Sequence, residues 1–230
     1  MADPRTAAVV FDIGGVLLDW DPRHLYRKLI GDDQRMTDFL GRICTPDWHL
    51  AHDLGADIEA SCRELAGRHP EHADLIMAWW QRGEEMVAGQ IDPVVDLLAE
   101  LKSAGVPCYA LSNMEAEKFA LRSARFGFFE LFDGCVISGA EGVVKPDPRI
   151  FRILLTRYRL ESEATAFIDD SPRNVRAAAE LGMTGIHFTG PAQLRDDLRR
   201  LGLAVAAASR AEGSRDPQPQ SSWSRTLPYM

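Results

Sequence analysis

Short apolar runs alternate with amphipathic stretches along most of the chain. The run at residues 7–11 (AAVVF) is almost wholly apolar, which is typical of a strand buried on both faces of a parallel sheet. Four further β-rich runs lie at residues 106–111, 135–138, 166–168 and 185–188. All but one of the five are followed by a helical pattern. Strands that alternate with helices predict an α/β fold with a Rossmann-like, doubly wound parallel sheet.

Acid–proline pairs at residues 92–93 and 147–148 each predict the start of a helix, with the acid as N-cap and the proline at the first helical position. An alanine-rich stretch at 174–181 predicts another helix, which Gly182 ends. The stretch at 93–103 has helical periodicity and is followed by Gly105. Its apolar face consists of Val94, Leu97, Leu98 and Leu101.

Residues 20–91 break this alternation, because they contain helical patterns and no convincing strand. Asp21 precedes a proline and predicts one helix start, and Asp57 predicts the N-cap of another. We therefore expect a helical subdomain inserted after the first strand. The predicted organisation is a core at 1–19 and 92–204, a helical insert at 20–91 and a flexible tail at 205–230, whose composition is rich in Ser, Pro and Gly.

The insert holds most of the conspicuous aromatic and histidine residues. Trp79 and Trp80 are expected to pack against the core domain, and His49 and His52 to be ordinary surface histidines, although their spacing would let them share a helical face. Trp20 is a candidate wall of a substrate pocket or a hinge-packing residue. Arg23 is a candidate contact for an anionic substrate tail or a residue of a solvated helix face.

Polar residues follow four of the predicted strands. Because ligands bind beyond the carboxyl ends of parallel strands, these side chains are expected to converge on one edge of the sheet. Any one of them is as readily explained as a helix cap, but the set is hard to obtain by chance. The candidates are Asp12 after the first strand, Ser112 and Asn113 after the second, Lys145 after the third, and Asp169 and Asp170 after the fourth.

The order of these elements resembles the haloacid dehalogenase-like hydrolase superfamily. Four segments carry the resemblance, FDIGGVLLD, ALSNM, VVKPDPRIF and FIDDSPRNV, and it covers about residues 7–190. The insert resembles the helical cap of one branch of that superfamily. The resemblance implies a hydrolase that works through a covalent intermediate on an aspartate.

The resemblance also implies a role for each matching residue. Asp12 matches the nucleophile, and Ser112, with Asn113 beside it, matches the hydroxyl that binds the transferring group. Lys145 matches the lysine that offsets negative charge. The acid pair matches residues that help to hold Mg²⁺, with Asp170 preferred over Asp169 as the direct ligand. The remaining metal ligands implied are Asp12 and the backbone carbonyl of Gly14.

One position departs from the superfamily's pattern. Its phosphatases usually place a second aspartate two residues after the nucleophile, as general acid for the leaving alcohol, and here that residue is Gly14. Loss of a general acid costs about 10²–10⁴ in rate. Val16 replaces a threonine-like residue, which is a milder departure. Paired with Gly15, Gly14 also allows a sharp turn and a close approach of the backbone to a ligand.

Three functions remain open at this point. The first is a Mg²⁺-dependent phosphatase for a small phosphorylated metabolite, supported by the acid pair. The second is a 2-haloacid dehalogenase type of hydrolase, in which Gly14 is harmless because halide needs no proton. The third is a binding or assembly protein that kept the fold and lost turnover. Dependence on metal separates the first two, and turnover that Asp12→Asn abolishes would eliminate the third.

Composition sets the outer bounds. The chain has 230 residues, 46% of them hydrophobic and 26% charged, which is the mix of a globular protein with a sizeable core. The net charge of −8 argues against a nucleic-acid partner, and no signal segment or membrane span is predicted. The four cysteines are widely spaced, so reduced thiols and a cytoplasmic location are expected. The oligomeric state is left open.

Overall fold

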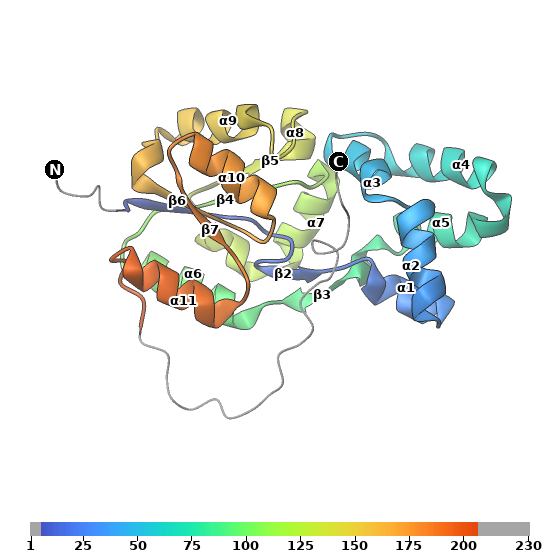
Figure 1. Cartoon of the computed structure of the whole chain (residues 1–230), viewed down its shortest axis with the longest axis horizontal. Helices are drawn as coiled ribbons and strands as arrows, with labels where there is room; N and C mark the ends of the chain where they lie inside the picture. Colours follow the sequence, from blue (N-terminus) through green and yellow to red (C-terminus); the bar gives the residue numbers. More distant parts are fainter. Residues whose placement is uncertain (1–5, 207–230) are drawn as a thin grey trace, which may run out of the picture.

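The computed structural model describes residues 6–206, and its centre is a five-stranded parallel sheet (Figure 1). The order of strands is β5-β4-β1-β6-β7, so the first strand is central and the chain winds outward in both directions. This confirms the predicted Rossmann-like α/β fold. The strands are β1 (Ala8–Phe11), β4 (Cys108–Ser112), β5 (Gly134–Ile137), β6 (Thr165–Asp169) and β7 (Thr184–His187).

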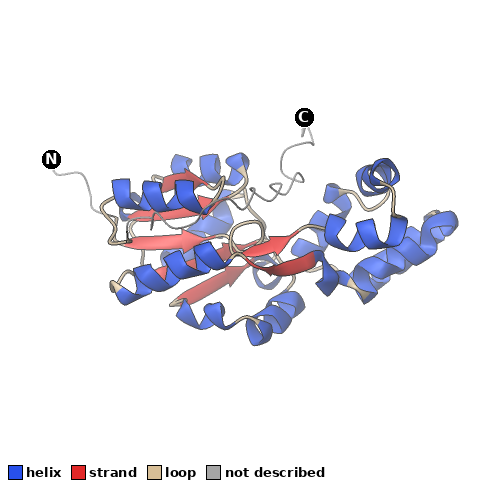
Figure 2. Cartoon of the chain, turned by 90° about the horizontal axis from the view of Figure 1, so that it is seen from below, coloured by secondary structure: helices blue, strands red, loops and turns tan. Residues whose placement is uncertain are grey.

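Alternate residues of β1 enter two different hydrophobic clusters, because successive side chains of a strand point to opposite faces. Val9 and Phe11 pack with α6 and α11 on one face, and Val10 packs with α9 and α10 on the other. Figure 2 shows helices on both sides of the sheet. The covering helices are α6 (Asp92–Ser103), α7 (Ala116–Arg125), α8 (Ser138–Glu141), α9 (Pro148–Tyr158), α10 (Pro172–Glu180) and α11 (Pro191–Arg200).

The helices predicted from the acid–proline pairs begin at the predicted positions, but only one of the two acids is an N-cap. Asp147 is the N-cap of α9 and accepts a hydrogen bond from the Arg149 amide at 2.9 Å. Asp92 is instead the first residue of α6 and caps nothing, since its carboxylate accepts from the Gln90 side chain. The predicted apolar face of α6 is fully buried in the core.

Residues between β1 and α6 form a helical insert with a hydrophobic cluster of its own. Leu25, Tyr26 and Trp79 are among its buried members. Asp57 caps α4 as predicted, accepting from the Ala60 amide at 2.9 Å. The helices of the insert are α1 (Arg23–Ile30), α2 (Asp33–Arg42), α3 (Pro46–Asp53), α4 (Ile58–Arg68) and α5 (Ala73–Gln81).

Two features of the insert differ from prediction. Residues 20–91 do contain a strand, since β3 (Val87–Gln90) pairs antiparallel with β2 (Leu18–Trp20) in a two-stranded arm between the insert and the sheet. Each strand is too short to carry a periodic pattern, so the arm depends on pairing that sequence does not reveal. Trp79 and Trp80 pack within the insert rather than against the core domain, because the insert is large enough to build its own cluster.

The predicted tail, residues 205–230, lies outside the described residues except for 205 and 206. Within residues 6–206, no helix has both the length and the apolar character needed to cross a bilayer. All four cysteines are free thiols, as expected.

Candidate active site

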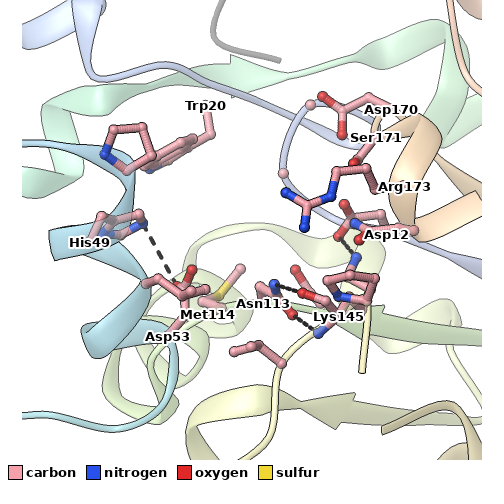
Figure 3. A pocket seen from close by; sticks show the side chains of 18 of the residues that line it. Asp12, Trp20, His49, Asp53, Asn113, Met114, Lys145, Asp170, Ser171 and Arg173 are labelled. Carbon is pink, nitrogen blue, oxygen red and sulfur yellow. Dashed lines mark hydrogen bonds and ion pairs between the residues drawn. The ribbon is translucent and has the colours of Figure 1, made fainter. Parts of the chain in front are cut away.

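A cavity of about 640 Å³ lies between the carboxyl edge of the sheet and the helical insert (Figure 3). Parallel strands end at this edge, so the residues that follow β1, β4 and β6 meet there. Asp12, Gly14, Ser112, Asn113, Lys145 and Asp170 all line the cavity, together with residues of α3 from the insert. The convergence predicted from the strand ends is therefore present.

Lys145 joins the two carboxylates that follow the central strands. Its Nζ lies 2.8 Å from Asp12 Oδ1 and 2.7 Å from Asp169 Oδ2, and it donates to the Leu111 carbonyl at 2.9 Å. Burial alone would lower the pKa of Lys145, but the charges of Asp12 and Asp169 outweigh burial and raise it. The lysine is therefore a fixed ammonium beside the proposed nucleophile.

The adjacent acids Asp169 and Asp170 are held differently. Asp169 is fully buried, and besides Lys145 its carboxylate accepts from the Ser171 amide at 2.8 Å and from the Asn174 side chain. Burial, together with the negative charges of Asp12 and Asp170, raises the pKa of Asp169 to about 8 although Lys145 opposes the shift. Asp170 lines the cavity, which Asp169 does not.

The loop after β1 is shaped to admit Asp170. Gly15 has φ +74°, and a Cβ on this residue would lie 2.5 Å from Asp170 Oδ2. Glycine at position 15 is therefore required on both conformational and steric grounds. Gly14 has no positive φ, and a Cβ there would meet nothing within 4 Å. The structure thus has room for the aspartate that the superfamily's phosphatases carry at position 14.

The two polar residues after β4 have separate surroundings. Ser112 ends the strand, is buried and lines the cavity. Asn113 exchanges a pair of hydrogen bonds with the main chain of Lys145, donating at 3.0 Å and accepting at 2.8 Å. Asn113 therefore orients the lysine-bearing loop.

The carboxylates fit a hard divalent cation. Oxygen atoms of Asp12, Asp169 and Asp170 all lie within 4.8 Å of one another. The three carboxylates and the Lys145 ammonium carry a formal charge of −2, and carboxylate oxygens are preferred ligands of Mg²⁺. The donor set present in this structure is thus compatible with the predicted metal.

The insert contributes the opposite wall of the cavity through α3. His49 stacks on Trp20 with ring centroids 5.3 Å apart, and its Nε2 lies 3.7 Å from Asp53 Oδ1. Burial lowers the pKa of His49 and lowers that of His52 to about 4. Burial also raises the pKa of Asp53, to about 7. Both imidazoles therefore favour the neutral form, and Asp53 keeps its proton to higher pH than an ordinary aspartate does.

The prediction that the two histidines of α3 lie on the surface is wrong. His52 is fully buried and the His49 side chain is 16% exposed, because His49 packs on Trp79 of α5 and His52 packs on Trp48 of its own helix. Arg23 is not among the residues that line the cavity, and its Nη1 lies 3.6 Å from Asp21 Oδ1 at the start of α1, so a contact with substrate stays a prediction. Trp20 does line the cavity, as a pocket-wall role would require.

Several cavity residues were not identified from the sequence. Asp53 follows His49 by four residues, so helical spacing was a signal that both share one face of α3. The cations that line the cavity had no such signal, because they lie on helices whose position depends on tertiary packing. Figure 3 shows Arg173 near Asp12. The other cations of the cavity wall are Arg122 and Arg176, and Glu115 is an acid that also lines it.

Comparison with known proteins places this geometry in a family. The family model described as haloacid dehalogenase-like hydrolase matches residues 6–182, which spans the sheet strands through β6 and the whole insert. The chain belongs to the haloacid dehalogenase-like hydrolases. The resemblance drawn from the four sequence segments is thereby confirmed.

Relatives of this hydrolase include phosphatases. The sesquiterpene phosphatase astK of Aspergillus oryzae is 31% identical over 199 residues, covering 84% of this chain and 95% of the relative. The phosphorylated carbohydrates phosphatase of Thermotoga maritima is 26% identical over 186 residues, covering 78% of this chain and 83% of the relative.

Solved structures share the fold. A haloacid dehalogenase family enzyme of Bacteroides thetaiotaomicron in a magnesium complex matches with a TM-score of 0.59 at 22% identity, covering 78% of this chain and 91% of that one. A dehalogenase with an intermediate complex also matches with a TM-score of 0.59 at 22% identity, covering 80% of this chain and 84% of that one. At this level of identity the structural matches establish the fold and do not choose between the two chemistries.

Proposed function

We propose that this haloacid dehalogenase-like hydrolase is a Mg²⁺-dependent phosphatase that cleaves a small phosphorylated metabolite through an aspartyl-phosphate on Asp12. The observation that carries the proposal is the position of Asp170. It brings a third carboxylate to the edge of the cavity, with ligand oxygens of Asp12, Asp169 and Asp170 all within 4.8 Å of one another. The two phosphatase relatives agree with this chemistry.

Asp12, Asp170 and the backbone carbonyl of Gly14 would hold the metal, with Asp169 beside them. When bound, Mg²⁺ would supply positive charge that lets a phosphoryl dianion approach these carboxylates. Asp169 would act chiefly through Lys145, because hydrogen bonds and the ion pair occupy its oxygens. We therefore propose Asp170, and not Asp169, as the direct metal ligand of the acid pair.

Asp12 would attack phosphorus with its carboxylate, and Lys145 would hold that carboxylate in place and offset charge on the transferring group. Ser112 would donate its hydroxyl hydrogen to a phosphoryl oxygen. Asn113 would position Lys145, since its amide is held by the lysine's main chain. Water would then release inorganic phosphate from Asp12 and restore the carboxylate.

The helical insert would act as a cap that selects the substrate and limits the access of water. It lines the same cavity as the sheet edge, through Trp20 and α3. The cavity is within the usual range for small-molecule sites. The substrate is proposed to be anionic, with no nucleic-acid or membrane partner. A cytoplasmic location is also kept as a proposal, on the basis of the four free cysteines.

A 2-haloacid dehalogenase activity is the second candidate. One observation favours it: Gly14 leaves no carboxylic acid two residues after the nucleophile, and halide leaves without a proton. Against it, the acid pair would repel a carboxylate substrate. A binding protein without turnover is the third candidate, and it rests on Gly14 alone.

A panel of phosphorylated metabolites and 2-haloacids, each assayed with Mg²⁺ and with a chelator, tests the proposal. We expect phosphate release that needs Mg²⁺ and that Asp12→Asn abolishes without loss of the fold. Halide release that persists in chelator would instead establish the dehalogenase. No turnover on any member of the panel would favour the binding protein.

A further inference from the structure

The glycine at position 14 leaves the proposed phosphatase without a donor for one proton. The leaving group of an ordinary alkyl phosphate is an alkoxide, which needs a proton as its bond to phosphorus breaks. The residue beside the nucleophile that usually supplies it is absent. A donor from elsewhere in the cavity must be a side chain that carries a proton near neutral pH and lies where the leaving group departs.

The leaving group is expected to depart toward the helical insert. In phosphoryl transfer the attacking and leaving oxygens are roughly in line with phosphorus between them. Asp12 stands at the sheet edge, so the leaving oxygen faces away from it. Figure 3 shows Asp53 across the cavity from Asp12, on the helix that forms the insert wall. Asp53 lines the same cavity as Asp12 and Lys145.

Asp53 is held firmly at this place. It is the last residue of α3, and its carbonyl oxygen accepts a hydrogen bond of 2.6 Å from Ser138 Oγ in the core domain. Ser138 Oγ in turn accepts from the Met114 amide at 2.9 Å, immediately after Asn113. The end of α3 is therefore tied to the loop that follows β4, and the Asp53 side chain is 11% exposed.

We infer that Asp53, supplied by the helical insert, is the general acid that replaces the aspartate missing at position 14. The inference rests on the proposed phosphatase function and adds a catalytic residue to it. In the step concerned, an Asp12 carboxylate oxygen bonds to phosphorus and the bond from phosphorus to the leaving oxygen breaks. Its electron pair stays on that oxygen, which takes the proton of the Asp53 carboxyl and departs as an alcohol.

The second step restores both residues. The Asp53 carboxylate takes a proton from the water that attacks phosphorus, and the bond between Asp12 and phosphorus breaks. Inorganic phosphate leaves, Asp12 is a carboxylate again and Asp53 is again protonated. The proton therefore cycles between Asp53, the alcohol and water, with no further reactant needed.

The surroundings of Asp53 keep its proton available. Burial raises its pKa to about 7, Lys145 and Arg122 oppose the shift, and Asp12 adds to it. The other titratable groups on this wall are His49 and His52 of α3 and Glu115 at the start of α7. His49 is neutral because burial lowers its pKa, so it does not draw the proton from Asp53.

Two neighbouring groups are less suited to this role. His49 has a lowered pKa and carries no proton to give as an imidazolium at neutral pH. Glu115 has a raised pKa, but the charges that act on it are those of His49 and Asp53 of α3 and of Arg122 and Lys118 of α7. Asp53 alone among the three is under the influence of both Asp12 and Lys145.

The test compares leaving groups in Asp53→Asn. We expect kcat/KM for an alkyl phosphate to fall by about 10²–10⁴, and kcat/KM for p-nitrophenyl phosphate to fall far less, because p-nitrophenolate leaves without a proton. Asp38→Asn is the matched control, since it makes the same change at an exposed residue of the insert, on α2, that does not line the cavity. The control should keep the wild-type ratio between the two substrates.

A second variant separates catalysis from folding. Gly14→Asp in the Asp53→Asn background should restore the alkyl phosphate selectively, because position 14 has room for a side chain. Equal losses on both substrates, or an unchanged alkyl phosphate rate in Asp53→Asn, would overturn the role of Asp53 while leaving the phosphatase intact. A wild type that hydrolyses neither ester would overturn the proposed function, and the acid role with it.

Discussion

At the scale of single residues, Lys145 is a buried cation between two buried carboxylates. Removing one partner of a buried ion pair leaves uncompensated charge and costs about 3–5 kcal/mol. We therefore expect Lys145→Met to lose both turnover and stability, as measured by urea denaturation. Lys28→Ala removes an exposed ion pair with Glu85 and should cost no more than about 1 kcal/mol. Equal losses in the two variants would contradict this account of the site.

The proposed role of Asp53 predicts how activity depends on pH. A general acid works only while protonated, and burial raises the pKa of Asp53 to about 7. The kcat/KM for an alkyl phosphate should therefore be level below this value and decline as the pH rises through it. In Asp53→Asn the decline near pH 7 should disappear, leaving a lower and flatter profile. A decline that stays in place in the variant would assign it to another group.

The close approach of Gly15 to Asp170 predicts that a side chain at position 15 would disturb the proposed metal site. Gly15→Ala combines a left-handed φ with a contact of 2.5 Å to Asp170 Oδ2, so the carboxylate must move. Gly105→Ala has a similar φ of +77° and no neighbour within 4 Å. Both variants should lose about 1–2 kcal/mol through backbone strain. Only Gly15→Ala should also need more Mg²⁺ for half-maximal activity, which a metal titration of the two variants would measure.

At the scale of elements, the connection between α3 and the core depends on Ser138. Ser138→Ala would leave the Met114 amide and the Asp53 carbonyl without their buried partner, a loss of about 1–3 kcal/mol. We expect faster hydrogen exchange at the end of α3 and a lower rate on alkyl phosphates. Ser123→Ala, which removes an exposed hydrogen bond to the Ala120 carbonyl, is the control. Unchanged exchange in α3 would show that other contacts hold this helix.

The elements differ in how well they could be predicted from the sequence. The strands of the sheet and the residues at their ends were predicted because β-rich runs bounded by helix signals are local features. The arm of β2 and β3 was missed because each strand is stabilised by the other and has little pattern of its own. The burial of His49 and His52 was missed for a related reason. It depends on the packing of α3 against Trp79 of α5, which the order of residues along one helix does not contain.

At the scale of the whole molecule, the core side of the cavity carries charged groups and the insert side carries groups that favour their neutral forms. The core gathers three carboxylates around one ammonium at the sheet edge, while the insert offers neutral imidazoles and an acid that keeps its proton near neutral pH. This division places the proposed nucleophile and an acid with a raised pKa in one cavity. Two carboxyl groups with different environments can then serve opposite roles in one reaction.

The charge on the core side also predicts how the folded protein responds to metal. A ligand that binds only the native state stabilises it, by about 2.7 kcal/mol at a concentration one hundred times its Kd. We expect Mg²⁺ to raise the Tm of the wild type in the absence of substrate and Asp170→Asn to reduce this shift strongly. Asp196→Asn, at an exposed position of α11, should keep the wild-type shift. Because the readout is stability, it reports on the carboxylates whether or not the substrate is known. A shift of equal size in both variants would mean that Mg²⁺ binds away from the Asp12 cluster, and the assignment of Asp170 as a ligand would fall.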